Sequence, residues 1–166
     1  SCSLHQNRTN AVPGEGSRTA NIVFIGEGPG FYEDKSGRPF VGPAGHFLDD
    51  MLASIDLKRE DVYITNMVKC RPDDNRDPLP EEIQACRPYL QKQLELVSPK
   101  VVVSLGGNAW ESLRSLLLRG QLMKYGDAVG VLPTPVDGGF HVAVNFHKRL
   151  LGVHHACAGS FSQFFY

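Results

Sequence analysis

The sequence contains no long hydrophobic run. None of its apolar segments approaches the roughly 20 residues that a membrane-spanning helix needs, and no secretory signal pattern is present. Net charge is also nearly absent, with 17 Lys and Arg against 18 Asp and Glu. Long-range attraction to nucleic acid is therefore not predicted, and any contact with DNA must come from local patches. We expect no membrane partner.

Cysteine is scarce, and its spacing is irregular. The chain has 4 cysteines among 166 residues, and no pair of them forms a CxxC motif. This pattern favours a reducing compartment and thiols that are free or bind a ligand. Cys2, Cys70 and Cys86 together could hold zinc or an iron–sulfur cluster if a fourth ligand joined them. Cys86 could equally be a buried helix residue, which is a common place for cysteine.

Internal repeats and low-complexity segments are lacking as well. The length suffices for one domain with a substantial core, which we expect over residues 1–166. Short β-branched runs predict buried strands, and apolar residues at helical spacing follow each of them. This alternation predicts an α/β fold with a parallel sheet covered on both faces. The first three strands are expected at Asn21–Ile25, Val62–Thr65 and Val101–Leu105.

Prolines and glycines mark where the helices begin. Pro43 opens one helix and Pro80 opens another, in which Pro88 predicts a kink or a division into two short helices. A third helix is expected after Gly106 and Gly107. The polar residues of the first helix and the turn after it are expected to be solvated; they are Asp49, Asp50, Lys58 and Arg59.

The remaining segments are predicted to be irregular or extended. Residues 1–20 indicate an irregular lead-in, and Phe31–Asp34 indicates a polar loop with aromatic side chains. Two extended segments around Val136–Gly139 predict a hairpin. Val142–Phe146 is expected to be the fourth main strand, and it ends beside His147.

The first strand runs into a glycine-rich turn, residues 26–30, with the sequence Gly-Glu-Gly-Pro-Gly. Glycine lets the backbone approach a ligand closely, and proline stiffens the turn. In open α/β sheets, ligands bind at the carboxyl ends of the strands. A glycine-rich turn is a weak indication by itself, so an ordinary tight turn is equally compatible with this segment.

Distinctive polar residues follow the strand ends, and parallel strands bring such ends to one edge of a sheet. An amide, carboxylates, an imidazole and an aromatic ring gathered there would suit a planar heterocycle. Each residue also has an ordinary explanation: Asn66 could be a turn former, for example, and Phe40 a core residue. Their shared placement favours a binding site. The residues concerned are Glu27, Glu33, Phe40, Asn66, Asn75 and His147.

Several linked motifs occur in a fixed order along the chain. They are Gly26-Glu27-Gly28-Pro29-Gly30, Gly37-Arg38-Pro39-Phe40-Val41-Gly42, Tyr63-Ile64-Thr65-Asn66, Lys69-Cys70-Arg71-Pro72 and Cys86-x-Pro88-Tyr89-Leu90. In residues, order and spacing they resemble the iron–sulfur uracil-DNA glycosylases, family 4. The resemblance runs from Cys2 to about Gly120.

The resemblance implies a three-layer α/β/α sandwich around a four-stranded parallel sheet. It also implies a DNA repair enzyme that flips uracil out of DNA and hydrolyses its N-glycosidic bond, leaving an abasic site for base excision repair. Its partner would be uracil-containing DNA, and we expect a monomer in a prokaryotic cytoplasm. The implied base-binding residues are Gly26, Gly28, Pro29, Gly30, Phe40 and Asn66, and the implied catalytic residues are Glu27, Glu33, Asn75 and His147.

Individual roles follow from the same resemblance. Phe40 would stack on the flipped base and Asn66 would read its pairing edge, while Glu33 would lie near C5 and exclude thymine. Glu33 or Asn75 would orient the attacking water. The sequence departs from the family at Gly28, where many relatives have Asp, and after His147, where Lys148 replaces proline.

A [4Fe-4S] cluster is implied as the cofactor, with Cys2, Cys70 and Cys86 as ligands. The family pattern places the fourth ligand before Ser1, and Cys157 is the alternative. Two other functions stay open. One is a catalytically weak relative that binds damaged or single-stranded DNA without excision, and the other is a nucleotide-binding α/β protein outside the family.

Overall fold

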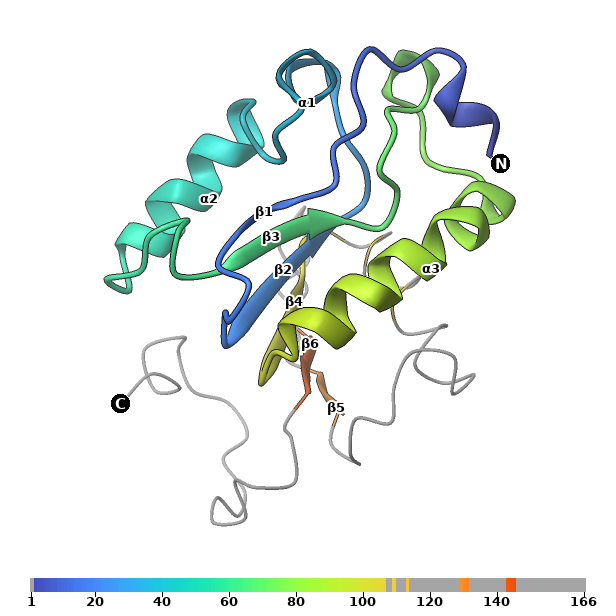
Figure 1. Cartoon of the computed structure of the whole chain (residues 1–166). Coiled ribbons are helices and arrows are strands. Elements are labelled where there is room, and N and C mark those ends of the chain that lie inside the picture. The colour runs from blue at the N-terminus through green and yellow to red at the C-terminus, as the bar shows by residue number, and fades with distance from the viewer. Residues whose placement is uncertain (1, 107–108, 110–112, 114–128, 132–142, 146–166) are drawn as a thin grey trace.

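A four-stranded sheet lies at the centre of the protein (Figure 1). The structure is a computed structural model that describes residues 2–106, 109, 113, 129–131 and 143–145, the last two segments by their backbone alone. Across the sheet the order is β1-β3-β2-β4, and the last three of these strands are parallel. The strands are β1 (Glu15–Gly16), β2 (Ile22–Gly26), β3 (Tyr63–Asn66) and β4 (Val101–Ser104).

Helices cover both faces of this sheet. They are α1 (Phe31–Ser36), α2 (Pro43–Ala53) and α3 (Pro80–Val97), with short 3-10 turns η1 (Ser3–His5) and η2 (Asp73–Asn75). Figure 1 shows α2 and α3 on opposite sides of the strands. The three-layer α/β/α architecture predicted from the sequence is therefore confirmed.

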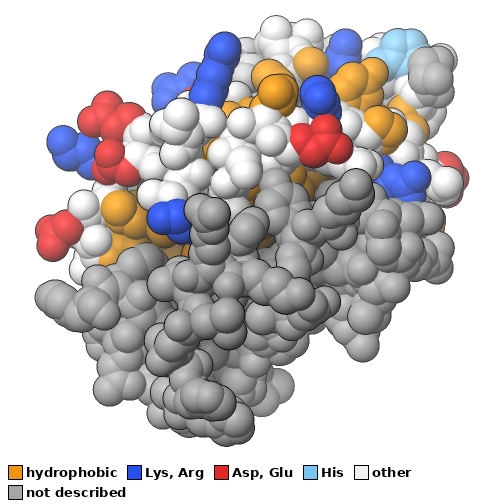
Figure 2. Space-filling model, turned by 60° about the horizontal axis from the view of Figure 1, so that its bottom comes forward, with side chains coloured by type: hydrophobic (Ala, Val, Ile, Leu, Met, Phe, Trp, Pro, Cys, Tyr) orange, Lys and Arg blue, Asp and Glu red, His pale blue; other side chains and the backbone are white. Residues whose placement is uncertain are grey.

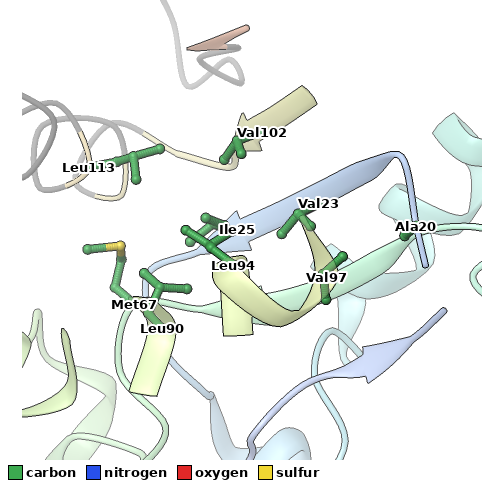
Figure 3. Packing of buried hydrophobic residues seen from close by; sticks show 9 residues of the cluster. All are labelled: Ala20, Val23, Ile25, Met67, Leu90, Leu94, Val97, Val102 and Leu113. Atoms are coloured by element: carbon green, nitrogen blue, oxygen red, sulfur yellow. The ribbon is translucent and has the colours of Figure 1, made fainter. Parts of the chain in front are cut away.

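Alternating residues of the strands build two separate cores, because successive side chains of a strand point to opposite faces. Val23 and Ile25 pack against α3, where Leu90 and Leu94 meet them (Figure 3). Phe24 points to the other face and packs against α2. The core on the α2 side contains Phe24, Leu48, Leu52, Val62, Ile64, Val103 and Leu105.

The predicted strands are present, but one partner in the sheet was not foreseen. β1 lies in the lead-in that we expected to be irregular, and it pairs with β3 in the antiparallel direction. The lead-in is ordered in this way because its backbone bonds to the segment that contains β3, for example from Val12 N to Lys69 O at 2.8 Å.

The predicted hairpin turn at Val136–Gly139 lies outside the described residues, and a short strand is present where the fourth main strand was expected. Strands β5 (Val129–Val131) and β6 (Ala143–Asn145) form an antiparallel pair. β6 lies close to β4, but its hydrogen-bonded partner among the described residues is β5. Within that part of the chain, the fourth strand of the main sheet is β1, so the sheet is mixed and not wholly parallel.

The prediction of a loop at Phe31–Asp34 was wrong, because these residues begin α1. Glu33 accepts a hydrogen bond from the N–H of Gly30 at 3.1 Å, and this caps the first turn. Gly37 ends the helix with φ 74°, a left-handed conformation that glycine adopts without strain.

Helix α3 is a single helix, although Pro88 lies inside it. Of the two alternatives that Pro88 predicted, a kink or two short helices, the structure excludes the two short helices. Proline removes the donor that would bond the carbonyl of Gln84, and both residues are exposed, so water can satisfy that carbonyl. None of the helices in the described part of the chain is long and apolar enough to cross a membrane.

The carboxylate of Glu82 fixes the start of α3. It is almost completely buried, and it accepts two hydrogen bonds from Arg76, at 2.9 and 2.7 Å, and one from Leu79 N at 2.8 Å. Ser3 Oγ also donates to it, at 3.2 Å. Hydrogen bonding by Arg76 outweighs burial and holds the pKa of Glu82 at about 2.

The Glu82→Gln variant should therefore unfold more easily at neutral pH. We expect the free energy of unfolding to fall by about 1–3 kcal/mol at pH 7, since a charge-assisted network is lost. The carboxylate favours the folded state above its unfolded pKa of about 4.3, and this advantage disappears as the pH falls through about 2. Urea unfolding from pH 7 down to pH 2.5 measures the difference between variant and wild type.

Glu81→Gln is the matched control. Glu81 is the exposed neighbour in the same helical turn, so its replacement should change stability by less than about 0.5 kcal/mol. An equal loss of unfolding free energy in the two variants would contradict the role of the Glu82 carboxylate in fixing the start of α3.

Candidate active site

Two loops run side by side at the carboxyl edge of the sheet. In the β2–β3 ladder, Gly26 is the register partner of Asn66. The pairing continues past the strand ends, with Met67 N donating to Gly26 O at 2.8 Å and Val68 N to Glu27 O at 3.1 Å. The glycine loop after β2, residues 26–30, and the loop after β3 are therefore held in fixed positions relative to one another.

The side chain of Asn66 is buried and has no hydrogen-bond partner. Asn66 is 1% exposed, and neither its Oδ1 nor its Nδ2 makes a hydrogen bond within the described structure. Buried polar groups are almost always paired, because an unpaired one loses its bonds to water without compensation. An unpaired amide at the ligand-binding edge of a sheet indicates a group reserved for a ligand.

The ring of Phe40 lies next to this amide. A methyl group added at Gly26 would collide with both Asn66 Oδ1 and the Phe40 ring, so the two side chains meet over the same glycine. Phe40 has φ 51°, a left-handed conformation that is strained for a bulky residue. A methyl group at Gly45 would strike the Phe40 carbonyl, so glycine is required there as well.

Arg59 holds the strained Phe40 backbone in place. Its guanidinium donates to Phe40 O at 3.0 Å and to Pro39 O at 2.6 Å. It also pairs with Glu15 and Asp49. The expectation that Arg59 is merely solvated was wrong, since its side chain is only 21% exposed.

Glu33 is bound by backbone N–H groups. Its Oε1 accepts hydrogen bonds from Val41 N and Gly42 N, both at 2.8 Å, and its Oε2 accepts the bond from Gly30 N. The carboxylate therefore ties the glycine loop to the loop that carries Phe40. It lies beside the predicted base-binding residues, but its oxygens are already engaged.

The other predicted catalytic residues lie in different environments. Glu27 is half-buried and takes part in an interaction. Asn75 is exposed and left-handed at φ 57°, and its Oδ1 accepts a hydrogen bond from Arg71 Nε at 2.7 Å. His147 lies outside the described residues.

The rest of the glycine loop packs against the segment that follows β3. Pro29 is buried, and a methyl group at Gly28 would stand 2.9 Å from Val68 Cγ2. The structure thus brings together Gly26, Gly28, Pro29, Gly30, Phe40, Asn66 and Glu33.

Three cysteines from distant parts of the sequence share one apolar cluster. Cys70 and Cys86 are buried and Cys2 is half-buried, and all three pack around Leu4 and Val68. Burial, together with the nearby Cys70 and Cys2 thiols, raises the pKa of the Cys86 thiol above its usual value. No group of three Cys, His, Asp or Glu residues in the described ranges stands close enough to bind one metal ion. Cys157 lies outside those ranges.

Lys69 is a buried cation that the sequence reasoning did not assign to the site. Its Nζ donates to Thr65 Oγ1 and to the main-chain oxygen of Asn66, each at 2.7 Å. Burial lowers its pKa to about 7. Two indications in the sequence are its place in the motif Lys69-Cys70-Arg71-Pro72 and its position inside an otherwise apolar run, Met67–Cys70.

An open groove of about 480 Å³ lies elsewhere on the surface. It is lined by Glu15, Gly16, Arg38, Lys58, Arg59 and Glu60, none of which is a predicted site residue. Its charges are paired with one another, as in the contacts of Glu15 with Arg38 and Arg59. Figure 2 likewise shows basic, acidic and hydrophobic side chains interspersed over the described part of one face. The groove therefore offers no free charge for a ligand.

Residues 13–155 match the family model described as the Uracil DNA glycosylase superfamily. The chain belongs to this superfamily. Similarity to individual proteins places the chain in the type-4 family: it is 47% identical to the type-4 uracil-DNA glycosylase of Thermotoga maritima over 152 residues, which is 90% of this chain and 76% of the relative.

Two further relatives carry the same name. The type-4 uracil-DNA glycosylase of Archaeoglobus fulgidus is 60% identical over 105 residues, 63% of this chain and 53% of the relative. That of Sulfurisphaera tokodaii is 58% identical over 106 residues, 63% of this chain and 48% of the relative. The chain thus spans about half the length of these two curated relatives.

The Arg59→Lys variant should be less stable than wild type. Lysine keeps the charge but loses the fork that bonds Pro39 and Phe40 together. We expect the free energy of unfolding to fall by about 1–3 kcal/mol. Arg38→Lys is the control, because Arg38 is 61% exposed and pairs only with Glu15 within the described structure, so its loss should stay below about 1 kcal/mol. Urea unfolding measures the stability of both variants. Equal losses of unfolding free energy would refute the role of Arg59 in holding the Phe40 backbone.

Proposed function

We propose that this chain excises uracil from DNA by hydrolysing the N-glycosidic bond, which leaves an abasic site. The observation that carries the proposal is the buried, unpaired amide of Asn66 beside the Phe40 ring. An amide and an aromatic ring that meet over a glycine can bind the edge and the face of one planar base. The names of the relatives, which are type-4 uracil-DNA glycosylases, support uracil as that base.

The amide of Asn66 can distinguish uracil from cytosine. Uracil presents a donor at N3–H and an acceptor at O4, which match the Oδ1 and Nδ2 of an asparagine. Cytosine presents the opposite order, so its binding would leave buried groups unpaired. Lys69 fixes the Asn66 backbone from the other side, which helps to keep the amide in one orientation.

Phe40 would stack on the base after it has left the DNA helix. A nucleotide must be extruded before its glycosidic bond can be reached, and an unpaired or mismatched uracil leaves at the lowest cost. The engaged carboxylate of Glu33 supports an anchoring role, in which it sets the position of the Phe40 loop near C5 of the base.

Bond cleavage leaves negative charge on uracil O2. Backbone N–H groups of the glycine loop and, in our proposal, His147 would stabilise that charge. Water then attacks the sugar cation, oriented by Glu33 or Asn75. Stabilisation of the leaving group is the larger contribution in this scheme, because Gly28 in the glycine loop has no side chain that could act as a base.

A [4Fe-4S] cluster on Cys2, Cys70 and Cys86 belongs to the same proposal. The donor set fits, because three thiols lie in one apolar cluster, with Arg8 donating to Cys70 Sγ at 2.9 Å. Cys2, Cys70 and Cys86 would each supply one thiolate to the cluster. The cluster would cross-link the lead-in, the loop after β3 and α3, and no step of base excision passes through it.

We further propose a monomer, a single domain over residues 1–166, in the cytoplasm of a prokaryote. The source organisms of the relatives support the last point.

Loss of the Asn66 amide should abolish most of the activity. We expect Asn66→Ala to slow uracil release from a uracil-containing oligonucleotide at least about a hundredfold, because both hydrogen bonds to the base are lost. Lys58→Ala, at an exposed site, should release uracil at the wild-type rate. Equal losses would discredit the pocket, and binding without any abasic product in wild type would show a DNA-binding relative that does not cut.

The cofactor can be tested independently of activity. Protein expressed from its complete gene and purified without oxygen should be brown and contain about four irons per chain. Cys70→Ser and Cys86→Ser should each lose colour and iron. Stoichiometric zinc without iron would overturn this part of the proposal.

A further inference from the structure

An exposed aromatic and cationic surface borders the candidate site. We call the group formed by Phe31, Tyr32, Lys35 and Arg71 the aromatic platform. Phe31 is 43% exposed and Tyr32 is 58% exposed, although both are large hydrophobic side chains. Their ring centroids are 5.6 Å apart, with the planes at 82°, so the pair has a defined edge-to-face geometry.

Two positive charges gather on the platform. Lys35 Nζ lies 4.5 Å from the centroid of the Phe31 ring, and Arg71 Cζ lies 5.3 Å from it. Lys35 belongs to α1 and Arg71 to the loop after β3, so the ring joins cations from two separate segments. Within the described structure neither is ion-paired with a carboxylate. The side chains of Lys35 and Arg71 can therefore bind phosphate groups.

The platform is continuous with the proposed base site. Phe31 directly follows Gly30, the last residue of the glycine loop. Tyr32 packs against the loop that carries Phe40, since a methyl group at Gly42 would stand 3.2 Å from Tyr32 Cδ2. Nucleotides next to a base bound at Phe40 and Asn66 would therefore reach the platform first.

We propose that the aromatic platform binds the single-stranded DNA that flanks the everted uracil. Tyr32 stacks on a neighbouring base, while Lys35 and Arg71 contact phosphates. The inference rests on the proposed function and adds a strand preference to it. Bases of a single strand have free faces for stacking, whereas those of a duplex are covered by their neighbours.

Binding of an uncleavable substrate tests this preference. The probes are a single-stranded oligonucleotide with one 2′-fluoro-2′-deoxyuridine and the same strand in a duplex, with guanine opposite the uracil. Dissociation constants come from fluorescence anisotropy. We expect Tyr32→Ala to weaken single-strand binding about fivefold to about a hundredfold, and duplex binding less than about twofold. Tyr32→Phe should bind as wild type does, because stacking does not need the hydroxyl.

Tyr89→Ala is the matched control, since Tyr89 is 66% exposed but lies on α3. It should bind both probes with the affinity of wild type.

Lys35→Gln should lower the salt dependence of single-strand binding, with a slope of log K against log salt that is smaller by about 0.7. Lys58→Gln, at another exposed lysine, should leave the slope unchanged. Thermal unfolding of each variant establishes that it is folded, and Tyr32→Leu replaces Tyr32→Ala if that variant is not.

The outcomes separate the platform from the proposed function. Unchanged single-strand binding by folded Tyr32→Ala, or equal losses on both probes, would overturn the platform; a protein partner would then account for its exposure. If wild type releases no uracil but its single-strand binding depends on Tyr32, the proposed function fails and the platform stands. If wild type releases uracil but its single-strand binding does not depend on Tyr32, the platform fails and the proposed function stands.

Discussion

The hydrogen-bonded pairing of two strand ends is the constraint on which the site depends. Gly26 and Asn66 are register partners, and the bond from Met67 N to Gly26 O continues the ladder beyond them. A shift by one residue would turn the Asn66 side chain to the opposite face of the sheet. The two cores prevent such a shift, because each strand buries one set of side chains against α3 and the other against α2.

The site contains several features that are unfavourable for folding when each is considered alone. Phe40 has a left-handed backbone, Asn66 has an unpaired amide, and Lys69 is a buried cation. Each costs stability in isolation. Surrounding bonds compensate for the strain at Phe40 and the charge of Lys69, through Arg59 and through the oxygens of Thr65 and Asn66. Nothing in the described structure compensates for the Asn66 amide, and this difference separates the ligand-binding group from its supports.

Sequence patterns predicted strands β2, β3 and β4, the layers and the meeting of Phe40 with Asn66, but not strand β1. These features depend on local apolar patterns and on the rule that parallel strand ends share an edge. Helix α1 was missed because its N-cap is Gly30, which has no side chain to mark the start of a helix, although Glu33 caps the first turn from three residues away. The roles of Arg59 and Asn75 depend on contacts formed only in the fold: Arg59 reaches Glu15, and Asn75 turns outward to Arg71.

The unpaired amide of Asn66 has a consequence for how the sequence of this protein can evolve. A leucine of similar volume would remove a desolvated amide from the interior, so it would be expected to favour the folded state. Selection for thermal robustness alone would therefore drive residue 66 toward an aliphatic side chain. An asparagine retained there by a lineage is a record that the ligand, and not the fold, still decides the residue.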